Sequence, residues 1–375
     1  MTQALTVSRS LSRRGHEVVG VVVGAAGRPL PSLFTSALPV PPISLPSPGF
    51  VVRGGRSLDL AATAASVIAN LGTTLASVRR LRAIAQSLAP DLVINFFEPL
   101  TGLAQMIRPL PCPVASVAHQ FMFLHPAYQW QPGIGWQRLG RRAFVRLVGW
   151  RSVKLALTLE PAPDLDDWLV VGPPLLRQEL LGLEPRSGDD YLVYLLNHGY
   201  AEDLRAWHRA HPEVVLHCFY DRPGAPEAQV VAPNLTFHRL NGSKFIALMA
   251  GCRAVVGTAG FESVSEAAWL GKPVFLVPVD GHLEQALNAA EAARLGLGIA
   301  DSGFHLDRLG ELPSTVANAG FRQLGRPRRR APRPAGSVGD ESRRLRAPRP
   351  GRAVIAPGVA EHAPSPGHPA TVSER

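Results

Sequence analysis

The segment AVVGTAGFESVSEAAWLGKPVFLVPVDGHLEQALNA, residues 254–289, decides how this sequence is interpreted. An apolar run that ends at Gly257 predicts a buried strand, and the small residues after it let the backbone pass close to a ligand. A helix is expected over 263–270, a second strand over 273–279 and a second helix over 284–295. Buried strands that alternate with helices in this way indicate a parallel sheet covered on both faces.

Polar residues follow both strands, at the edge of a parallel sheet where ligands bind. The first helix favours an anion such as a phosphate at its N-terminus, because its leading N–H groups have no partners within the helix. Glu266, one turn further on, suits the hydroxyls of a ribose. Glu284, Gln285 and Asn288 offer further donors and acceptors for hydroxyl groups. For the first cluster alone, an ordinary helix cap formed by Ser263 and Glu266 explains the residues equally well.

The same alternation occurs twice along the chain, with a long helical stretch expected over 58–88. Strands are expected at 17–24, 91–97, 113–120 and 155–160, and again at 191–197, 213–220, 235–240, 254–260 and 273–279. The economical interpretation is an α/β protein of two doubly wound domains, 1–160 and 181–320, joined by a Pro-rich connector at 161–180.

Residues 257–289 resemble the nucleotide-sugar-binding region of GT-B glycosyltransferases. The similarity is greatest to those that resemble the lipid-linked N-acetylglucosaminyltransferase of peptidoglycan synthesis. DLVINFFEPLTGLA (91–104) and SVAHQFMFLHP (116–126) extend the resemblance, which covers roughly residues 1–320. It implies a GT-B fold, in which two Rossmann-like domains face a cleft, and a hexosyltransferase that needs neither a metal nor another cofactor. A nucleotide-sugar epimerase and a non-catalytic nucleotide-sugar-binding remnant are the alternatives.

The resemblance implies that the donor, a nucleotide-diphosphate sugar, binds mainly to the C-terminal domain. Residues 260–263 would contact the diphosphate, Glu266 the ribose, and Glu284 and Gln285 the sugar. The expected donor-binding residues are Thr258, Gly260, Phe261, Glu262, Ser263, Glu266, His282, Glu284, Gln285, Asn288 and His198.

His119 and Glu98 follow expected strands of the first domain and are predicted to face the cleft. Either could be the general base that deprotonates an acceptor hydroxyl, or could only orient the acceptor. The plain alternative for His119 is a histidine whose hydrogen bonds are satisfied at a strand end. His16 lies in a helix-to-strand turn and is not expected to act as a base.

The net charge of +10 belongs mostly to the C-terminal residues 321–375, which contain 12 Arg and four acids. This Arg- and Pro-rich tail is predicted to be disordered, because it has too little apolar surface to offset the entropy of ordering. Nucleic acid is not an expected partner, since the tail lacks interleaved aromatic residues and any recognised fold. Its composition also resembles that encoded by GC-rich DNA out of frame.

The first strand and the Gly-rich loop of the resembling family are expected to be missing before Thr2. Without a central strand its neighbours would have exposed edges, so poor folding or weak activity is expected. Aromatic and basic residues mix over 121–154, which suits a membrane interface or a lipid-linked acceptor, or else a surface helix with core-facing aromatics. Three separated cysteines fit a reducing compartment. The expected location is the cytoplasm, with the inner membrane face as a peripheral site.

Overall fold

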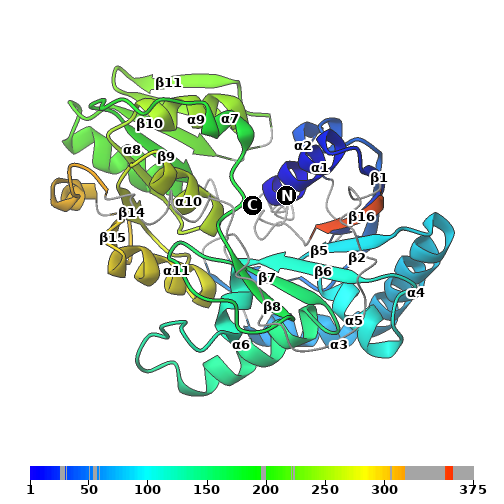
Figure 1. Ribbon diagram of the computed structural model, residues 1–375. Coiled ribbons are helices and arrows are strands. Elements are labelled where there is room, and N and C mark those ends of the chain that lie inside the picture. The colour runs from blue at the N-terminus through cyan, green and yellow to red at the C-terminus, as the bar shows by residue number, and fades with distance from the viewer. Residues whose placement is uncertain are drawn as a thin grey trace, which may run out of the picture.

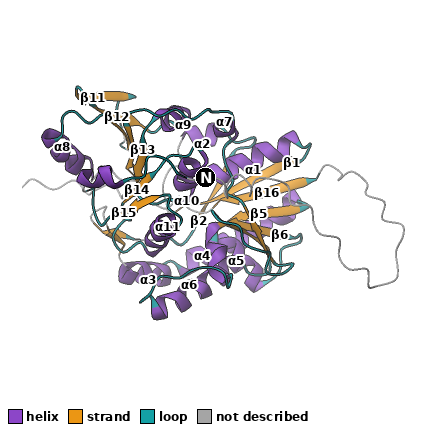
Figure 2. Cartoon of the chain, turned by 60° about the vertical axis from the view of Figure 1, so that its left-hand side comes forward, coloured by secondary structure: helices purple, strands orange, loops and turns teal. Residues whose placement is uncertain are grey.

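The computed structural model describes residues 1–25, 30, 32–49, 51–53, 57–58, 60–195, 200–220, 222, 224–304, 306–316 and 351–357. The described chain forms two domains, each built on a seven-stranded sheet with helices packed against it (Figures 1 and 2). This arrangement confirms the predicted pair of doubly wound α/β domains.

The first domain has a seven-stranded sheet of the order β2-β1-β16-β5-β6-β7-β8, and all of the paired strands in this sheet are parallel. Its elements, in chain order, are α1 (Thr2–Arg13), β1 (Glu17–Ala25), α2 (Ser32–Ser36), β2 (Pro42–Pro46), the hairpin strands β3 (Val52–Arg53) and β4 (Ser57–Leu58), α3 (Leu60–Ala69), α4 (Leu71–Leu88), β5 (Leu92–Phe96), α5 (Pro99–Ile107), β6 (Val114–Ala118), the 3-10 helix η1 (His119–Leu124), α6 (Gly135–Val148), β7 (Val153–Leu157), β8 (Leu169–Gly172) and, from the C-terminus, β16 (Arg352–Pro357).

The second domain has the order β11-β12-β10-β9-β13-β14-β15, in which only the edge pair β11–β12 is antiparallel. Its elements are β9 (Tyr191–Leu195), α8 (Ala201–Ala210), β10 (Leu216–Tyr220), β11 (Ala228–Ala232), β12 (Leu235–Arg239), α9 (Gly242–Gly251), β13 (Ala254–Gly257), α10 (Phe261–Trp269), β14 (Val274–Leu276), α11 (Leu283–Arg294), β15 (Gly298–Ala300) and η3 (Leu306–Glu311). The short helix α7 (Gln178–Leu181) lies beside α9 of the second domain (Figure 1).

The strand β16 corrects the prediction that residues 321–375 are disordered throughout. It lies between β1 and β5, where Ile355 is fully buried opposite Val21 and Ile94. Its four central residues are apolar, as a strand covered on both faces requires. The edges of β1 and β5 are therefore paired, at the place where a missing strand was expected to leave them exposed. The rest of the tail lies outside the described residues.

Side chains at the start of β1 and β5 hold the beginning of β16. His16 Nδ1 accepts a hydrogen bond from the Gly351 backbone N–H at 3.0 Å, and Asp91 Oδ2 accepts one from the Arg352 N–H at 2.7 Å. His16 lies in the helix-to-strand turn, as predicted, and there it also receives this distant segment.

Two further boundaries differ from the expectations. Residues 169–172, placed in the connector, form β8 and pair with β7, because the run LVV is apolar enough for a sheet position. The single helix expected over 58–88 consists of α3 and α4, which are bent by 63° at a break between them. In the described part of the chain no single helix is long and apolar enough to cross a membrane, although this bent pair passes that test together.

Candidate functional site

The loop between β13 and α10 gives the helix an uncapped beginning. α10 begins at Phe261, two residues before the predicted start, because Gly260 adopts the extended N-cap conformation. The Ser263 hydroxyl donates to the Gly260 carbonyl at 3.0 Å, so the predicted alternative of a Ser263 cap is wrong. Among the described residues, no side chain caps this end of the helix. No described side chain therefore competes with an anion for its leading N–H groups, and anion binding there stays a prediction.

Asn288, a residue of the predicted cluster on α11, holds the loop between β13 and α10. Ala259 has a left-handed backbone, with φ of 58°, and its carbonyl accepts a hydrogen bond from Asn288 Nδ2 at 3.0 Å. Asn288 on α11 is buried, and within the described part of the chain its Oδ1 has no hydrogen-bond partner. Thr258, before the loop, is buried as well. Asn288 therefore connects the cluster predicted to bind the sugar to the one predicted to bind phosphate, and its Oδ1 is left as an unsatisfied acceptor.

Other predicted residues at the start of α11 have structural partners. His282 is the N-cap, and its Nδ1 accepts from the Gln285 N–H at 3.2 Å. Gln285 Oε1 accepts from the Val279 N–H at 2.8 Å. Glu284 Oε1 accepts from Gln120 Nε2 of the first domain at 2.6 Å. These bonds fix the orientation of the helix start at the domain boundary. His198 lies outside the described residues.

Glu266 is paired with an arginine that the sequence analysis did not identify. Arg177, immediately before α7, donates from Nε to Oε1 at 2.6 Å and from Nη2 to Oε2 at 2.5 Å. Burial raises the pKa of the Glu266 carboxyl, and the hydrogen bonds and charge of Arg177 oppose that rise only in part. Two lone pairs on each oxygen leave acceptor capacity beyond the arginine. Arg177 thus orients Glu266, the residue predicted to bind the ribose.

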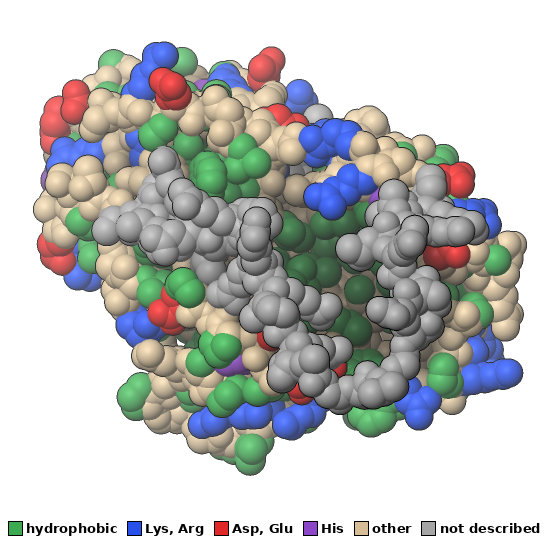
Figure 3. Space-filling model, in the orientation of Figure 1, with side chains coloured by type: hydrophobic (Ala, Val, Ile, Leu, Met, Phe, Trp, Pro, Cys, Tyr) green, Lys and Arg blue, Asp and Glu red, His purple; other side chains and the backbone are tan. Residues whose placement is uncertain are grey.

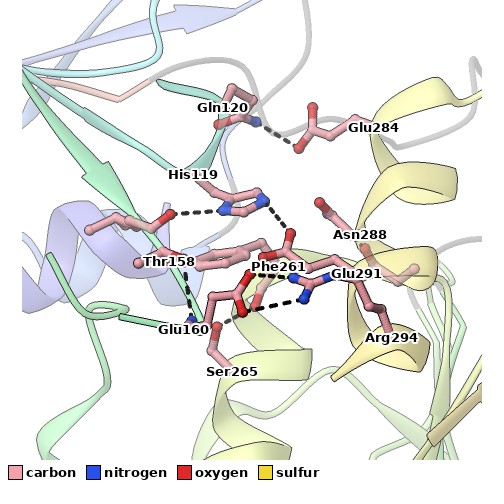
Figure 4. A network of polar contacts seen from close by, with 12 residues as sticks. His119, Gln120, Thr158, Glu160, Phe261, Ser265, Glu284, Asn288, Glu291 and Arg294 are labelled. Atoms are coloured by element: carbon pink, nitrogen blue, oxygen red, sulfur yellow. Dashed lines mark hydrogen bonds and ion pairs between the residues drawn. The ribbon is translucent and has the colours of Figure 1, made fainter. Parts of the chain in front are cut away.

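His119 lies at the boundary of the two domains (Figure 4). Its Nδ1 is 2.8 Å from the Leu157 carbonyl oxygen, and its Nε2 is 3.1 Å from Glu291 Oε2 on α11. Its ring stacks on Phe261, the first residue of α10, with centroids 4.1 Å apart. The structure therefore brings His119 to the predicted phosphate site, with Nδ1 hydrogen-bonded and Nε2 at ion-pair distance from Glu291.

Glu98 follows β5 at the same edge of the first sheet, as predicted, but it is buried. It is the N-cap of α5, where its Oε1 accepts from the Leu100 N–H at 3.1 Å and from the Ser47 hydroxyl at 2.6 Å. These contacts give Glu98 a structural task. Its catalytic role, like that of His119, stays a prediction.

Gly24→Ala is expected to disrupt this end of the first sheet. A Cβ at Gly24 would lie 2.0 Å from Glu98 Oε2, so the carboxylate would have to leave the helix cap. We expect a loss of about 1–3 kcal/mol in the free energy of unfolding, measured by denaturant titration. Gly72→Ala, with nothing within 4 Å of its added Cβ, is the control. Equal stability of both variants would contradict the packing of Glu98 against Gly24.

Three residues at this site escaped the sequence analysis: Arg177, Gln120 and Glu291. Arg177 lies in an irregular Pro-rich segment without periodicity. Glu291 follows Glu284 by two helical turns on α11, so the helix period was a usable signal for a residue on the same face.

Comparisons with known proteins agree with this architecture. A model of the family described as glycosyl transferase family 1 matches residues 4–315. The UDP-N-acetylglucosamine–N-acetylmuramyl-(pentapeptide) pyrophosphoryl-undecaprenol N-acetylglucosamine transferase of Methylorubrum extorquens is 46% identical over 65 residues. That match spans 16% of this chain and only 18% of the relative's length.

Two solved structures show the same fold. UGT89C1 of Arabidopsis thaliana, complexed with UDP-L-rhamnose, superposes with a TM-score of 0.54 and 16% identity, covering 86% of this chain and 89% of that one. UGT2 of Phytolacca americana, complexed with UDP-2fluoro-glucose and pterostilbene, superposes with a TM-score of 0.53 and 15% identity, covering 85% of each chain.

Proposed function

Because the chain belongs to glycosyl transferase family 1 and is a glycosyltransferase of the GT-B type, we propose that it transfers a sugar from a nucleoside diphosphate to an acceptor hydroxyl without a metal. The observation that carries the proposal is the uncapped start of α10, beside which Asn288 has a buried, unsatisfied acceptor. The two superposed structures contain UDP-sugars, which makes uridine diphosphate the first nucleotide to test.

In this proposal the second domain binds the donor. The N–H groups and the dipole of α10 stabilise the diphosphate, including the charge that develops as it leaves. Glu266, oriented by Arg177, accepts hydrogen bonds from the ribose hydroxyls. Glu284, Gln285 and Asn288 surround the sugar. A base role for His119 or Glu98 requires that an incoming acceptor displace their present partners.

Calorimetric titration with UDP and a panel of UDP-sugars tests the donor, and mass spectrometry of the products tests transfer and hydrolysis. Asn288→Asp is expected to weaken UDP binding at least tenfold. The new carboxylate repels the diphosphate, and it cannot donate the hydrogen bond that Asn288 Nδ2 gives to the Ala259 carbonyl. Asn234→Asp is the matched control, since Asn234 also donates to a backbone carbonyl, that of Pro212. Failure of the native protein to bind or convert any nucleotide sugar would overturn the proposal.

We further propose a lipid-linked acceptor and a peripheral site on an anionic membrane. The curated relative in Methylorubrum extorquens acts on a pyrophosphoryl-undecaprenol substrate. On α6 the side chains of Trp136 and Leu139 are 75% and 70% exposed, and four arginines share that helix. Basic side chains gather along the lower edge of Figure 3, where Figure 1 places α6. Exposed aromatic and aliphatic residues beside arginines suit an anionic lipid surface.

Trp136→Ser with Leu139→Ser is expected to weaken binding to vesicles that contain anionic lipid about tenfold or more, measured by co-sedimentation. The apolar contact with the lipid is lost, while the charge is unchanged. Val230→Ser, at an exposed position of β11, is the control. Equal sedimentation of the double variant and the native protein would exclude α6 as the membrane contact.

A further inference from the structure

The helix α11 of the second domain is joined to the first domain by polar contacts. Figure 4 shows three of them around His119. The pairs are Gln120 with Glu284, Gln131 with the Ala286 carbonyl, His119 with Glu291, and Glu160 with Arg294. Among these pairs, only His119 also contacts α10 through a stacked ring, that of Phe261.

The oxygens around His119 favour a proton on both of its ring nitrogens. Nδ1 lies 2.8 Å from a carbonyl oxygen, and Nε2 lies 3.1 Å, an ion-pair distance, from an oxygen of Glu291. A carbonyl oxygen and an ionised carboxylate only accept hydrogen bonds, so a doubly protonated ring suits both neighbours. The positive charge of such an imidazolium lies against the face of the Phe261 ring, an arrangement that favours a cation.

The surrounding groups favour the positively charged form of His119. Burial lowers the pKa of His119, but the charge and hydrogen bond of Glu291, the Leu157 carbonyl and the charge of Glu284 together raise it above its ordinary value. Tyr128, whose ring makes a T-shaped contact with His119, is a neutral phenol, because burial and the two glutamates raise its pKa. The remaining charge on this face of α11, Arg294, is paired with Glu160.

We propose that Glu291 is a positioning residue, which keeps His119 as an imidazolium and through its stacked ring holds Phe261 and the start of α10 against the first domain. The proposal rests on the proposed function in one respect: the start of α10 is the site assigned to the donor diphosphate. Glu291 acts through His119.

This arrangement couples the domain contact to pH. The pKa of His119 is raised where the ring lies against Glu291. The contact between His119 and Glu291 is therefore fully present below the ordinary histidine pKa of about 6.5. It weakens as the pH rises through the raised value, because a neutral ring cannot donate from both nitrogens.

Histidine ring NMR of the full chain tests the charge directly, with His119→Gln used to assign the signal. In the native protein the His119 ring is expected to keep the imidazolium shift at pH 7. Glu291→Gln is expected to lower the pKa of the ring, because burial is then opposed only by the charge of Glu284 and the Leu157 carbonyl. Glu291→Asp, which retains the carboxylate, is expected to restore part of the shift. A ring that is neutral at pH 6 in the native protein, or a shift that Glu291→Gln leaves unchanged, would overturn the proposal.

Hydrogen exchange and UDP titration test the consequence for α10. Glu291→Gln is expected to speed amide exchange over residues 261–264 and to weaken UDP binding about fivefold at pH 7. Glu160→Gln is the matched control, since it breaks a neighbouring ion pair of the same interface without contacting His119. If the native protein binds no UDP but Glu291→Gln still speeds exchange, the proposed function fails and the positioning role stands. If UDP binds equally to both with unchanged exchange, the positioning role fails.

Discussion

Ile355→Asp is expected to unfold the first domain. Ile355 is fully buried in β16, an interior strand of the sheet, between Val21 and Ile94. The change removes an apolar side chain, which costs about 2–5 kcal/mol, and places a carboxylate without a partner in the core, which adds several more. A domain of ordinary stability does not tolerate that sum. Loss of the first domain's thermal transition, with rapid amide exchange in β1 and β5, is the expected result.

Val230→Asp is the matched control, because it makes the same kind of change at a strand position that is 72% exposed. Its melting temperature is expected to stay within a few degrees of that of the native protein. The second domain has its own apolar core and is expected to keep its transition in Ile355→Asp. An unchanged first transition in Ile355→Asp would show that β16 does not lie between β1 and β5 in solution.

β16 also shows what the sequence leaves out of reach. β13, α10, β14 and α11 were predictable, because long apolar runs alternate with helical periods within 40 residues or so. β16 has only four apolar residues inside a segment rich in Arg and Pro, and its partner strands lie some 260 to 340 residues earlier in the chain. Composition averaged over 321–375 hides so short a run, and nothing local indicates the distant pairing.

For the candidate site, too, the local sequence identifies some residues and not others. Asn288, Glu284 and Gln285 were identified because they follow a strand end in one continuous segment. Arg177 and Gln120 come from other segments and reach the site only through tertiary packing. For Glu98 a local signal existed: a proline follows it, and a proline at the first helical position marks the residue before it as the N-cap.

Arg177→Met is expected to destabilise the second domain by about 3–5 kcal/mol at pH 7, because it leaves the buried Glu266 carboxylate without its two-pronged partner. The pKa of Glu266, already raised by burial, is expected to rise further without the arginine. When the pKa of a carboxyl is higher in the folded than in the unfolded protein, the free energy of unfolding increases as the pH falls. The loss is therefore expected to be larger at pH 8 than at pH 5 in denaturant titrations. Arg9→Met is the control, since its ion pair with Glu179 is half-exposed and is expected to contribute less than about 1 kcal/mol.

The double variant Arg177→Met, Glu266→Leu separates folding from donor binding. An apolar pair in place of a buried ion pair restores most of the stability, because no charge remains to be solvated. The Glu266 carboxylate, proposed to bind the ribose, is absent, however. Charge-assisted hydrogen bonds of the kind it would form contribute about 1.5–3 kcal/mol. UDP binding, measured by calorimetry, is therefore expected to stay about 10- to 100-fold weaker than in the native protein. Recovery of native affinity together with stability would remove the ribose role of Glu266 and leave the Arg177–Glu266 pair as a structural contact.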